Sequence, residues 1–307
     1  MGKSPPDIEA LAYGKHTPPP PPPLPKPWFP WLVPLIFVAN IVVFVYSMYV
    51  NNCPETTGPE YCVLYDPLKR YSFQPLKENM VLGPSVETLE LLGALDPKMV
   101  VQNGEEWRFF TCMWLHAGLA HLVTNMMSLL FIGIRLEQEF GFFRIGMLYL
   151  LSGFGGSLMS SLSPKRSISV GASGALLGLL GGMLSELITN WTIYANKCAA
   201  ISTLTLIVGL NLALGLIPHV DNSAHVGGFL SGFLLGFILL IRPQYGYVSR
   251  KYIPAGYDMK HRKSKHKCYQ YLLWVAALVT LVIGFAWGLD RLYTEKRLEI
   301  EPFPSTP

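Results

Sequence analysis

Hydrophobic residues in this 307-residue chain gather into seven blocks, and polar residues separate each block from the next. Each block is about 20 residues long, which is the length that a helix needs to cross the ~30 Å hydrocarbon core of a bilayer. The blocks predict membrane-spanning helices at residues 28–50, 114–134, 143–162, 169–189, 196–217, 223–241 and 270–290. We therefore expect an all-α polytopic membrane protein, in which a bundle of six helices is followed by one extra C-terminal transmembrane helix.

The composition supports this interpretation. Half of the residues are hydrophobic and 14% are charged, whereas about 25% of the residues in an ordinary soluble domain are charged. This excludes a soluble globular enzyme and a nucleic-acid-binding module, and we expect no nucleic acid among the partners. The five cysteines lack the spacing of a metal site, so we expect no metal and no cofactor.

Proline-rich and charged segments predict the topology. Residues 1–27 hold six consecutive prolines and are expected to form a disordered tail, to which an SH3- or WW-type module could bind. The loop 242–269 carries eight Lys or Arg residues against one acidic residue, and the positive-inside rule assigns it to the cytosol. Counting back through the spans places the N-terminus in the cytosol as well. The long loop 51–113 and the tail 291–307 then lie outside the cell or in a lumen.

Small residues recur at every fourth position in two of the predicted spans. The span at 169–189 carries Gly174, Gly178 and Gly182, and the span at 223–241 carries Ala224, Gly228, Gly232 and Gly236. Such stripes allow two helices to approach closely in lipid. If the stripes face each other, Ser173 and His225 lie at a similar depth, roughly 5–10 Å below the outer surface.

Polar side chains inside membrane spans are costly and often mark function. Serine is a poor nucleophile until a neighbouring base removes its proton, and the imidazole of His225 can serve as that base. A lone serine in a span usually binds the carbonyl four residues earlier, but the matching depth of His225 favours catalysis by Ser173. No acidic residue lies in the outer part of either span, so we expect a dyad without a carboxylate.

A further pair of polar residues lies at the same predicted boundary. His121 and Asn125 are one turn apart on the helix predicted at 114–134. They could donate hydrogen bonds to the oxyanion that forms when a serine attacks a peptide carbonyl. The alternative is that they only connect helices by hydrogen bonds.

Several motifs, in this order along the chain, resemble those of the rhomboid intramembrane serine proteases. They are Trp107-Arg108, His121-Leu-Val-Thr-Asn125, Gly171-Ala-Ser-Gly174 and Ala224-His-Val-Gly-Gly228. Glu137 and Gly141 also resemble an acidic-then-glycine stretch of this family. The resemblance covers residues 105–240, and the extra C-terminal span is similar to the six-plus-one arrangement of eukaryotic secretory-pathway members.

The resemblance implies a protease that cleaves the transmembrane segments of other proteins within the lipid bilayer. It assigns Ser173 as the nucleophile and His225 as the general base. His121 and Asn125, with the backbone N–H of Ser173, would form the oxyanion hole. Many family members carry a tyrosine four residues after the nucleophile, and in this chain the corresponding residue is Leu177.

Other residues are expected to support the site structurally. Trp107 and Arg108 would shape the first loop. The supporting glycines are Gly171, Gly174, Gly178, Gly228 and Gly232.

A non-catalytic rhomboid-fold protein that binds or escorts membrane clients remains the alternative function. A channel or transporter is disfavoured, because the spans show no repeat and hold few ionisable residues at mid-membrane.

The long first loop contains a candidate disulfide between Cys53 and Cys62. Pro54, Gly58 and Pro59 between them favour a turn, and the predicted topology places the loop in an oxidising compartment. Two free thiols are the alternative.

The sequence has no Arg-rich transit peptide, so we expect an integral membrane protein of the Golgi, the endosome or the plasma membrane.

Overall fold

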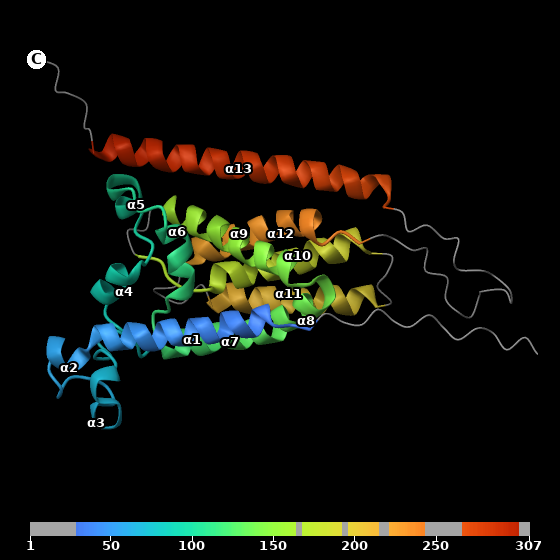
Figure 1. The fold of residues 1–307 in the computed structure, drawn as a ribbon. Helices are drawn as coiled ribbons and strands as arrows, with labels where there is room; N and C mark the ends of the chain where they lie inside the picture. The colour runs from blue at the N-terminus through green and yellow to red at the C-terminus, as the bar shows by residue number, and fades with distance from the viewer. Residues whose placement is uncertain (1–28, 164–167, 192–195, 215–220, 243–265, 301–307) are drawn as a thin grey trace, which may run out of the picture.

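The computed structural model describes residues 29–163, 168–191, 196–214, 221–242 and 266–300, which form a bundle of long helices lying side by side (Figure 1). The long helices are α1 (Leu32–Asn51), α7 (Leu119–Ser128), α8 (Ile134–Phe140), α9 (Phe142–Ser161), α10 (Ser173–Thr189), α11 (Lys197–Leu214), α12 (Asn222–Leu239) and α13 (Cys268–Ile300). A π-helical segment, Leu129–Gly133, joins α7 to α8 into one continuous rod. The described residues contain two isolated β-bridges and no strand.

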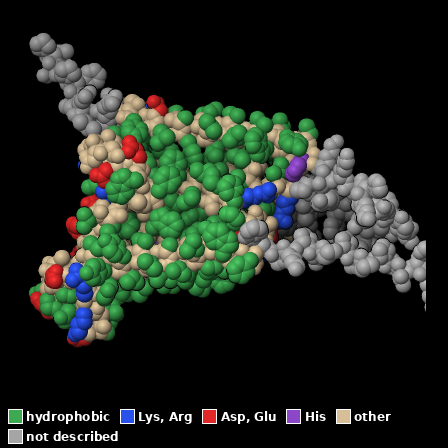
Figure 2. All heavy atoms as spheres, viewed as in Figure 1, with side chains coloured by type: hydrophobic (Ala, Val, Ile, Leu, Met, Phe, Trp, Pro, Cys, Tyr) green, Lys and Arg blue, Asp and Glu red, His purple; other side chains and the backbone are tan. Residues whose placement is uncertain are grey.

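Five of these segments are long and apolar enough to cross a membrane, namely α1, the α7–α8 rod, α9, α12 and α13, while α10 is a shorter apolar helix of 17 residues. On the face drawn in Figure 2, hydrophobic side chains cover the middle of the molecule, and acidic and basic side chains gather at its two ends. This is the surface that a bilayer requires, because lipid tails cannot solvate charged groups. The all-α membrane architecture predicted from the hydrophobic blocks is confirmed.

The helix predicted at 114–134 differs in its bounds, because it begins at Leu119 and continues to Phe140. Residues 115–118 are not helical, and Leu115 and His116 are buried within the protein. The first N–H groups of α7 donate to loop carbonyl oxygens: Leu119 to Leu82 at 2.8 Å and Ala120 to Val81 at 3.3 Å. Hydrophobicity predicted a span here because it does not distinguish a side chain facing lipid from one buried in protein.

The last helix, α13, is also longer than the predicted span at 270–290. It comprises 33 residues and includes positions 291–300, which we expected to belong to a tail. These positions are rich in Arg, Glu and Lys, which are charged but favour a helix, and the leucines among them favour it as well. The helix packs along α12 and α9 and contacts α5 (Pro97–Asn103).

The loop 51–113 folds into short helices at one end of the bundle, which we name the loop end (Figure 1). They are α2 (Cys53–Thr56), α3 (Tyr65–Leu68), α4 (Val86–Leu92), α5, α6 (Arg108–Thr111) and the 3-10 turns Lys69–Tyr71 and Cys112–Trp114. A disulfide joins Cys53 and Cys62, whose Cα atoms are 6.1 Å apart.

At the opposite end of the bundle, a buried carboxylate binds the first residues of α1. Glu137 of α8 accepts hydrogen bonds from the backbone N–H groups of Trp31, Leu32 and Val33, at 2.8–3.0 Å. Because the first N–H groups of a helix have no partner within it, this carboxylate caps α1 from a neighbouring helix. The interaction explains why an acidic residue is tolerated at a position that is fully buried.

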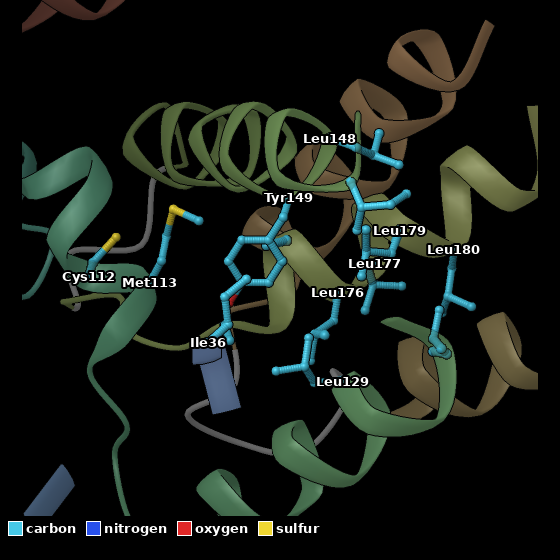
Figure 3. Packing of buried hydrophobic residues seen from close by; sticks show 14 of the residues in the cluster. Ile36, Cys112, Met113, Leu129, Leu148, Tyr149, Leu176, Leu177, Leu179 and Leu180 are labelled. Carbon is cyan, nitrogen blue, oxygen red and sulfur yellow. The ribbon is translucent and has the colours of Figure 1, made fainter. Parts of the chain in front are cut away.

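Three helices, α9, α10 and α12, pack at the centre of the bundle with glycines at their contacts. A Cβ atom added to Gly228 would clash with the carbonyl oxygen of Gly174, and one added to Gly232 would clash with that of Gly178. The two predicted stripes therefore face each other. Gly178 itself faces α9, where an added Cβ would clash with the side chain of Ser152. Leucines of α10 fill the surrounding core together with Tyr149 of α9 and Leu129 (Figure 3).

Candidate active site

The close packing of α10 and α12 brings Ser173 and His225 together. Ser173 is the first residue of α10, and His225 lies in the first turn of α12. The Nε2 atom of His225 is 2.8 Å from the Oγ atom of Ser173, a hydrogen-bond distance. Side chains larger than hydrogen at Gly228 or Gly232 would hold the two helices too far apart for this contact.

The other ring nitrogen of His225 has no side-chain support. Its Nδ1 atom is buried and has no hydrogen-bond partner among the described residues. The nearest carboxylate in sequence, Asp221, instead accepts hydrogen bonds from the backbone N–H groups of Ser223 and Ala224 and from the hydroxyl of Ser160. Ser173 and His225 thus form a hydrogen-bonded pair, and no described carboxylate forms a hydrogen bond with the imidazole.

Asp221 is a residue that the sequence analysis missed, because it lies just before the span predicted at 223–241. It occupies the N-cap position of α12. The signal was present in the sequence, since an Asp that directly precedes an apolar helical block is a typical N-cap.

The segment before Ser173 lies against α7. Gly171 has a φ of +124°, which favours glycine, and a Cβ atom there would lie 2.6 Å from Cε1 of His121 and 3.6 Å from Nδ2 of Asn125. The backbone N–H of Gly171 donates to the carbonyl of Cys112 at 2.9 Å. The structure therefore brings His121 and Asn125 next to the backbone that leads to Ser173.

Asn125 is placed to act as a hydrogen-bond donor. It is buried, and its Nδ2 atom has no acceptor among the described residues. A buried amide without a hydrogen-bond partner destabilises the folded state. The presence of Asn125 at this position is explained if an atom of a ligand accepts the hydrogen bond from Nδ2. The N–H groups in the first turn of α10, including that of Ser173, also lack partners within the helix.

His116 is a second residue for which the sequence analysis proposed no role. It is fully buried, and its ring lies edge-on to that of His121, with centroids 5.3 Å apart. His121 therefore contacts His116 and lies next to Gly171. Its position could not be predicted from the helical spacing, because His116 precedes the first residue of α7.

Trp107 and Arg108 lie at the start of α6, in the loop end. The buried guanidinium of Arg108 donates to the carbonyls of Glu90 and Ala94, at 2.8 and 2.7 Å, and to the carboxylate of Glu105 at 2.6 Å. The hydrogen bond from Arg108 lowers the pKa of Glu105. Arg108 thus links α4 and the residues after it to α6, whereas Trp107 is 47% exposed.

The loop end and the site are connected by two short backbone contacts. Leu95 and Ser169 form an isolated antiparallel bridge, with reciprocal hydrogen bonds of 3.0 and 3.1 Å. The bond between Gly171 and Cys112 is the second. Both precede Ser173 by only a few residues, so the folded loop sets the path of the chain into α10.

Two further features concern the chemistry of the site. Leu177 is buried one turn after Ser173 and belongs to the hydrophobic core (Figure 3). Among the described residues, no group of three or more His, Cys, Asp or Glu side chains is arranged to hold a metal ion.

Comparisons with known proteins agree with the motifs. The family model of the rhomboid domain matches residues 103–242, a range that contains Ser173 and His225. RHOMBOID-like protein 5 of Arabidopsis thaliana is 58% identical over 310 residues, covering 99% of each chain. RHOMBOID-like protein 1 of the same plant is 64% identical over 264 residues, which are 86% of this chain and 67% of the relative. Inactive RHOMBOID-like protein 8 of Arabidopsis thaliana is 44% identical over 214 residues, 70% of this chain and 60% of the relative.

Proposed function

The chain belongs to the rhomboid family, and from this premise we propose that it is an intramembrane serine endopeptidase that cleaves the transmembrane segments of other membrane proteins. The observation that carries the proposal is the 2.8 Å contact between Nε2 of His225 and Oγ of Ser173. A serine hydroxyl in a span needs only a backbone carbonyl as its partner, so an imidazole at this distance favours a chemical role.

In the proposed mechanism, Oγ of Ser173 attacks the carbonyl carbon of the scissile peptide bond while its proton passes to Nε2 of His225. This requires a neutral imidazole that carries its proton on Nδ1. The tetrahedral intermediate then collapses, and His225 gives the proton to the leaving amine. Water, deprotonated by His225 in turn, hydrolyses the acyl-enzyme and regenerates Ser173.

The negative charge of the tetrahedral intermediate falls on the former carbonyl oxygen. We propose that Asn125 Nδ2, His121 and the backbone N–H of Ser173 donate hydrogen bonds to it. The unpartnered Nδ2 of Asn125 supports this assignment, because a donor held ready before the reaction costs little reorganisation when the charge develops.

The position of Ser173 leads to a proposal about substrates. Ser173 begins α10 at the end that contacts the folded loop, so the scissile bond must reach it near one membrane boundary. A peptide bond inside a helix is shielded and its carbonyl is already hydrogen-bonded. The substrate must therefore unwind locally, and substrates with small or helix-breaking residues in that part of their span should be preferred.

We propose that the loop end lies outside the cell or in a lumen and that the N-terminus is cytosolic, in the Golgi, the endosome or the plasma membrane. The basic loop that supports this orientation lies largely outside the described residues, as does the proline-rich tail to which an SH3- or WW-type module could bind. Membrane lipids and transmembrane proteins are the other proposed partners.

The alternative is a rhomboid fold that binds membrane clients without cleaving them, and it is kept because two similar proteins are named inactive. A fluorophosphonate probe, which reacts with activated serines, separates the two functions. The purified wild-type protein should be labelled, and the Ser173→Ala variant should not. Absence of labelling in the wild type, or equal labelling of the variant, would favour the client-binding function.

A further inference from the structure

The first turn of α12, which carries His225, is tied to α9 through one side chain. Oδ1 of Asp221 accepts hydrogen bonds from the backbone N–H groups of Ser223 and Ala224, at 3.1 and 3.3 Å. Oδ2 of the same carboxylate accepts a hydrogen bond from the hydroxyl of Ser160, in the last turn of α9. The backbone N–H of His225 donates to the carbonyl of Asp221 at 3.4 Å.

The imidazole of His225 has few other means of being positioned. Its Nδ1 atom has no hydrogen-bond partner among the described residues, whereas in a Ser-His-Asp triad a carboxylate holds this atom and fixes the ring. The ring therefore takes its position from the backbone of the first turn of α12. Whatever fixes this turn also sets the distance between Nε2 and Oγ of Ser173.

The neighbouring glycine contacts of α12 set how close the helices come, but among the described residues none of them is a hydrogen bond from a side chain. A Cβ atom at Gly227 would clash with the Cβ atom of Met159 and lie 2.7 Å from the carbonyl oxygen of Gly155, and one at Gly228 would clash with Gly174. These are packing contacts without a preferred direction. A hydrogen bond is directional, so the bond between Asp221 and Ser160 can hold the turn in one rotation and height.

We propose that Asp221 and Ser160 are positioning residues for the general base: they hold the first turn of α12 against α9 and thereby align His225 with Ser173. The inference rests on the proposed function, and neither residue contacts the reacting atoms. The carboxylate replaces, through the backbone, the support that a triad gives to Nδ1.

An ordinary N-cap elsewhere in the chain provides a matched control. Asp96 caps α5, and its carboxylate accepts a hydrogen bond from the backbone N–H of Lys98 at 2.8 Å. Among the described residues it accepts no hydrogen bond from another helix. Asp96→Ala therefore removes a cap of the same kind without touching α12.

The experiment compares Ser160→Ala, Asp221→Ala, Asp221→Asn and Asp96→Ala in the full-length protein in detergent. The rate of fluorophosphonate labelling and the melting temperature are measured for each variant. Ser160→Ala and Asp221→Ala should label about 10- to 100-fold more slowly, because a small displacement of a catalytic group costs this much. Asp221→Asn should remain within about threefold of the wild type, since asparagine also caps a helix and its amide can bond to the Ser160 hydroxyl.

A purely structural role would give a different pattern. It predicts that labelling by Asp221→Ala and by Asp96→Ala falls only in parallel with their melting temperatures. That pattern, or wild-type labelling of both Ser160→Ala and Asp221→Ala, would overturn the proposal.

A second readout separates this proposal from the proposed function. The 15N resonances of the imidazole of His225, assigned by their loss in His225→Ala, should shift in Ser160→Ala and stay unchanged in Asp96→Ala. If the wild type is not labelled, the proposed function fails, but the resonances still decide whether Asp221 and Ser160 position His225. Unchanged resonances in Ser160→Ala would contradict the positioning role.

Discussion

At the scale of single residues, the site depends on one hydrogen bond between two side chains of different helices. Ser173→Ala and His225→Ala should each abolish cleavage of a transmembrane substrate, because the first removes the nucleophile and the second its base. Both substitutions shorten a side chain without adding volume, so folding should persist. Purified variants are checked for cleavage and for melting temperature, and near-normal cleavage without Ser173 would refute the mechanism.

The oxyanion donor is the second prediction at this scale. Asn125→Ala should slow cleavage by about 10- to 1,000-fold, the range expected when one oxyanion donor is lost. The lower part of the range is expected, because His121 and a backbone N–H remain. The exposed Asn103 is the control, and Asn103→Ala should leave the rate unchanged. If the double variant His121→Ala/Asn125→Ala cleaves at an unchanged rate, the two residues only connect helices and do not stabilise the oxyanion.

At the scale of helices, the proposed activity requires that α10 and α12 lie close together. Gly228→Val should strongly reduce cleavage, because its side chain would clash with the backbone of Gly174 and separate the helices that carry the dyad. Gly284 provides a matched control, since a Cβ atom added there meets nothing within 4 Å. The Gly284→Val variant should cleave a transmembrane substrate at the wild-type rate. Equal activity of the two variants would show that this contact does not set the geometry of the site.

The loop end is the other element that can be tested. Replacing both Cys53 and Cys62 by serine should lower the free energy of unfolding by about 2–3 kcal/mol, the value expected for a disulfide that closes a short loop. Intact-mass measurement after alkylation gives the direct check. The native protein should resist alkylation at both cysteines until it is reduced. If both cysteines are alkylated without reduction, the disulfide is absent and the proposed topology is weakened.

At the scale of the whole molecule, the proposed function restricts the substrate, because Ser173 lies at the end of α10 that contacts the folded loop. A model substrate with Gly or Pro in the corresponding half of its span should be cleaved faster than one in which this half is rebuilt from Leu and Ala. Gly and Pro lower the cost of local unwinding, by about 1 and 3 kcal/mol relative to Ala. The two substrates keep the same end residues, and equal rates would show that unwinding does not limit cleavage.

The sequence by itself determined the membrane architecture and the four polar residues that the structure brings to the site. Hydrophobic blocks of about 20 residues predict spanning helices, because lipid cannot hydrogen-bond to the backbone and a helix pairs all of its backbone groups within one segment. The glycine stripes were visible for a similar reason, since close approach of helices requires small residues at a fixed spacing. Ser173, His225, His121 and Asn125 were found from their depth and from their motifs.

Only the tertiary structure decided which groups meet. The start of α7 at Leu119, the burial of His116 and the bond between Asp221 and Ser160 all arise from contacts between residues far apart in the chain. Hydropathy describes each residue's preference for an apolar surrounding, but protein and lipid provide that surrounding equally well. The sequence predicted a dyad without a carboxylate, because no acidic residue lies in the outer part of either span. The contact between Asp221 and Ser160 could not be predicted in the same way, because hydrogen bonds are made between positions in space rather than positions in the chain.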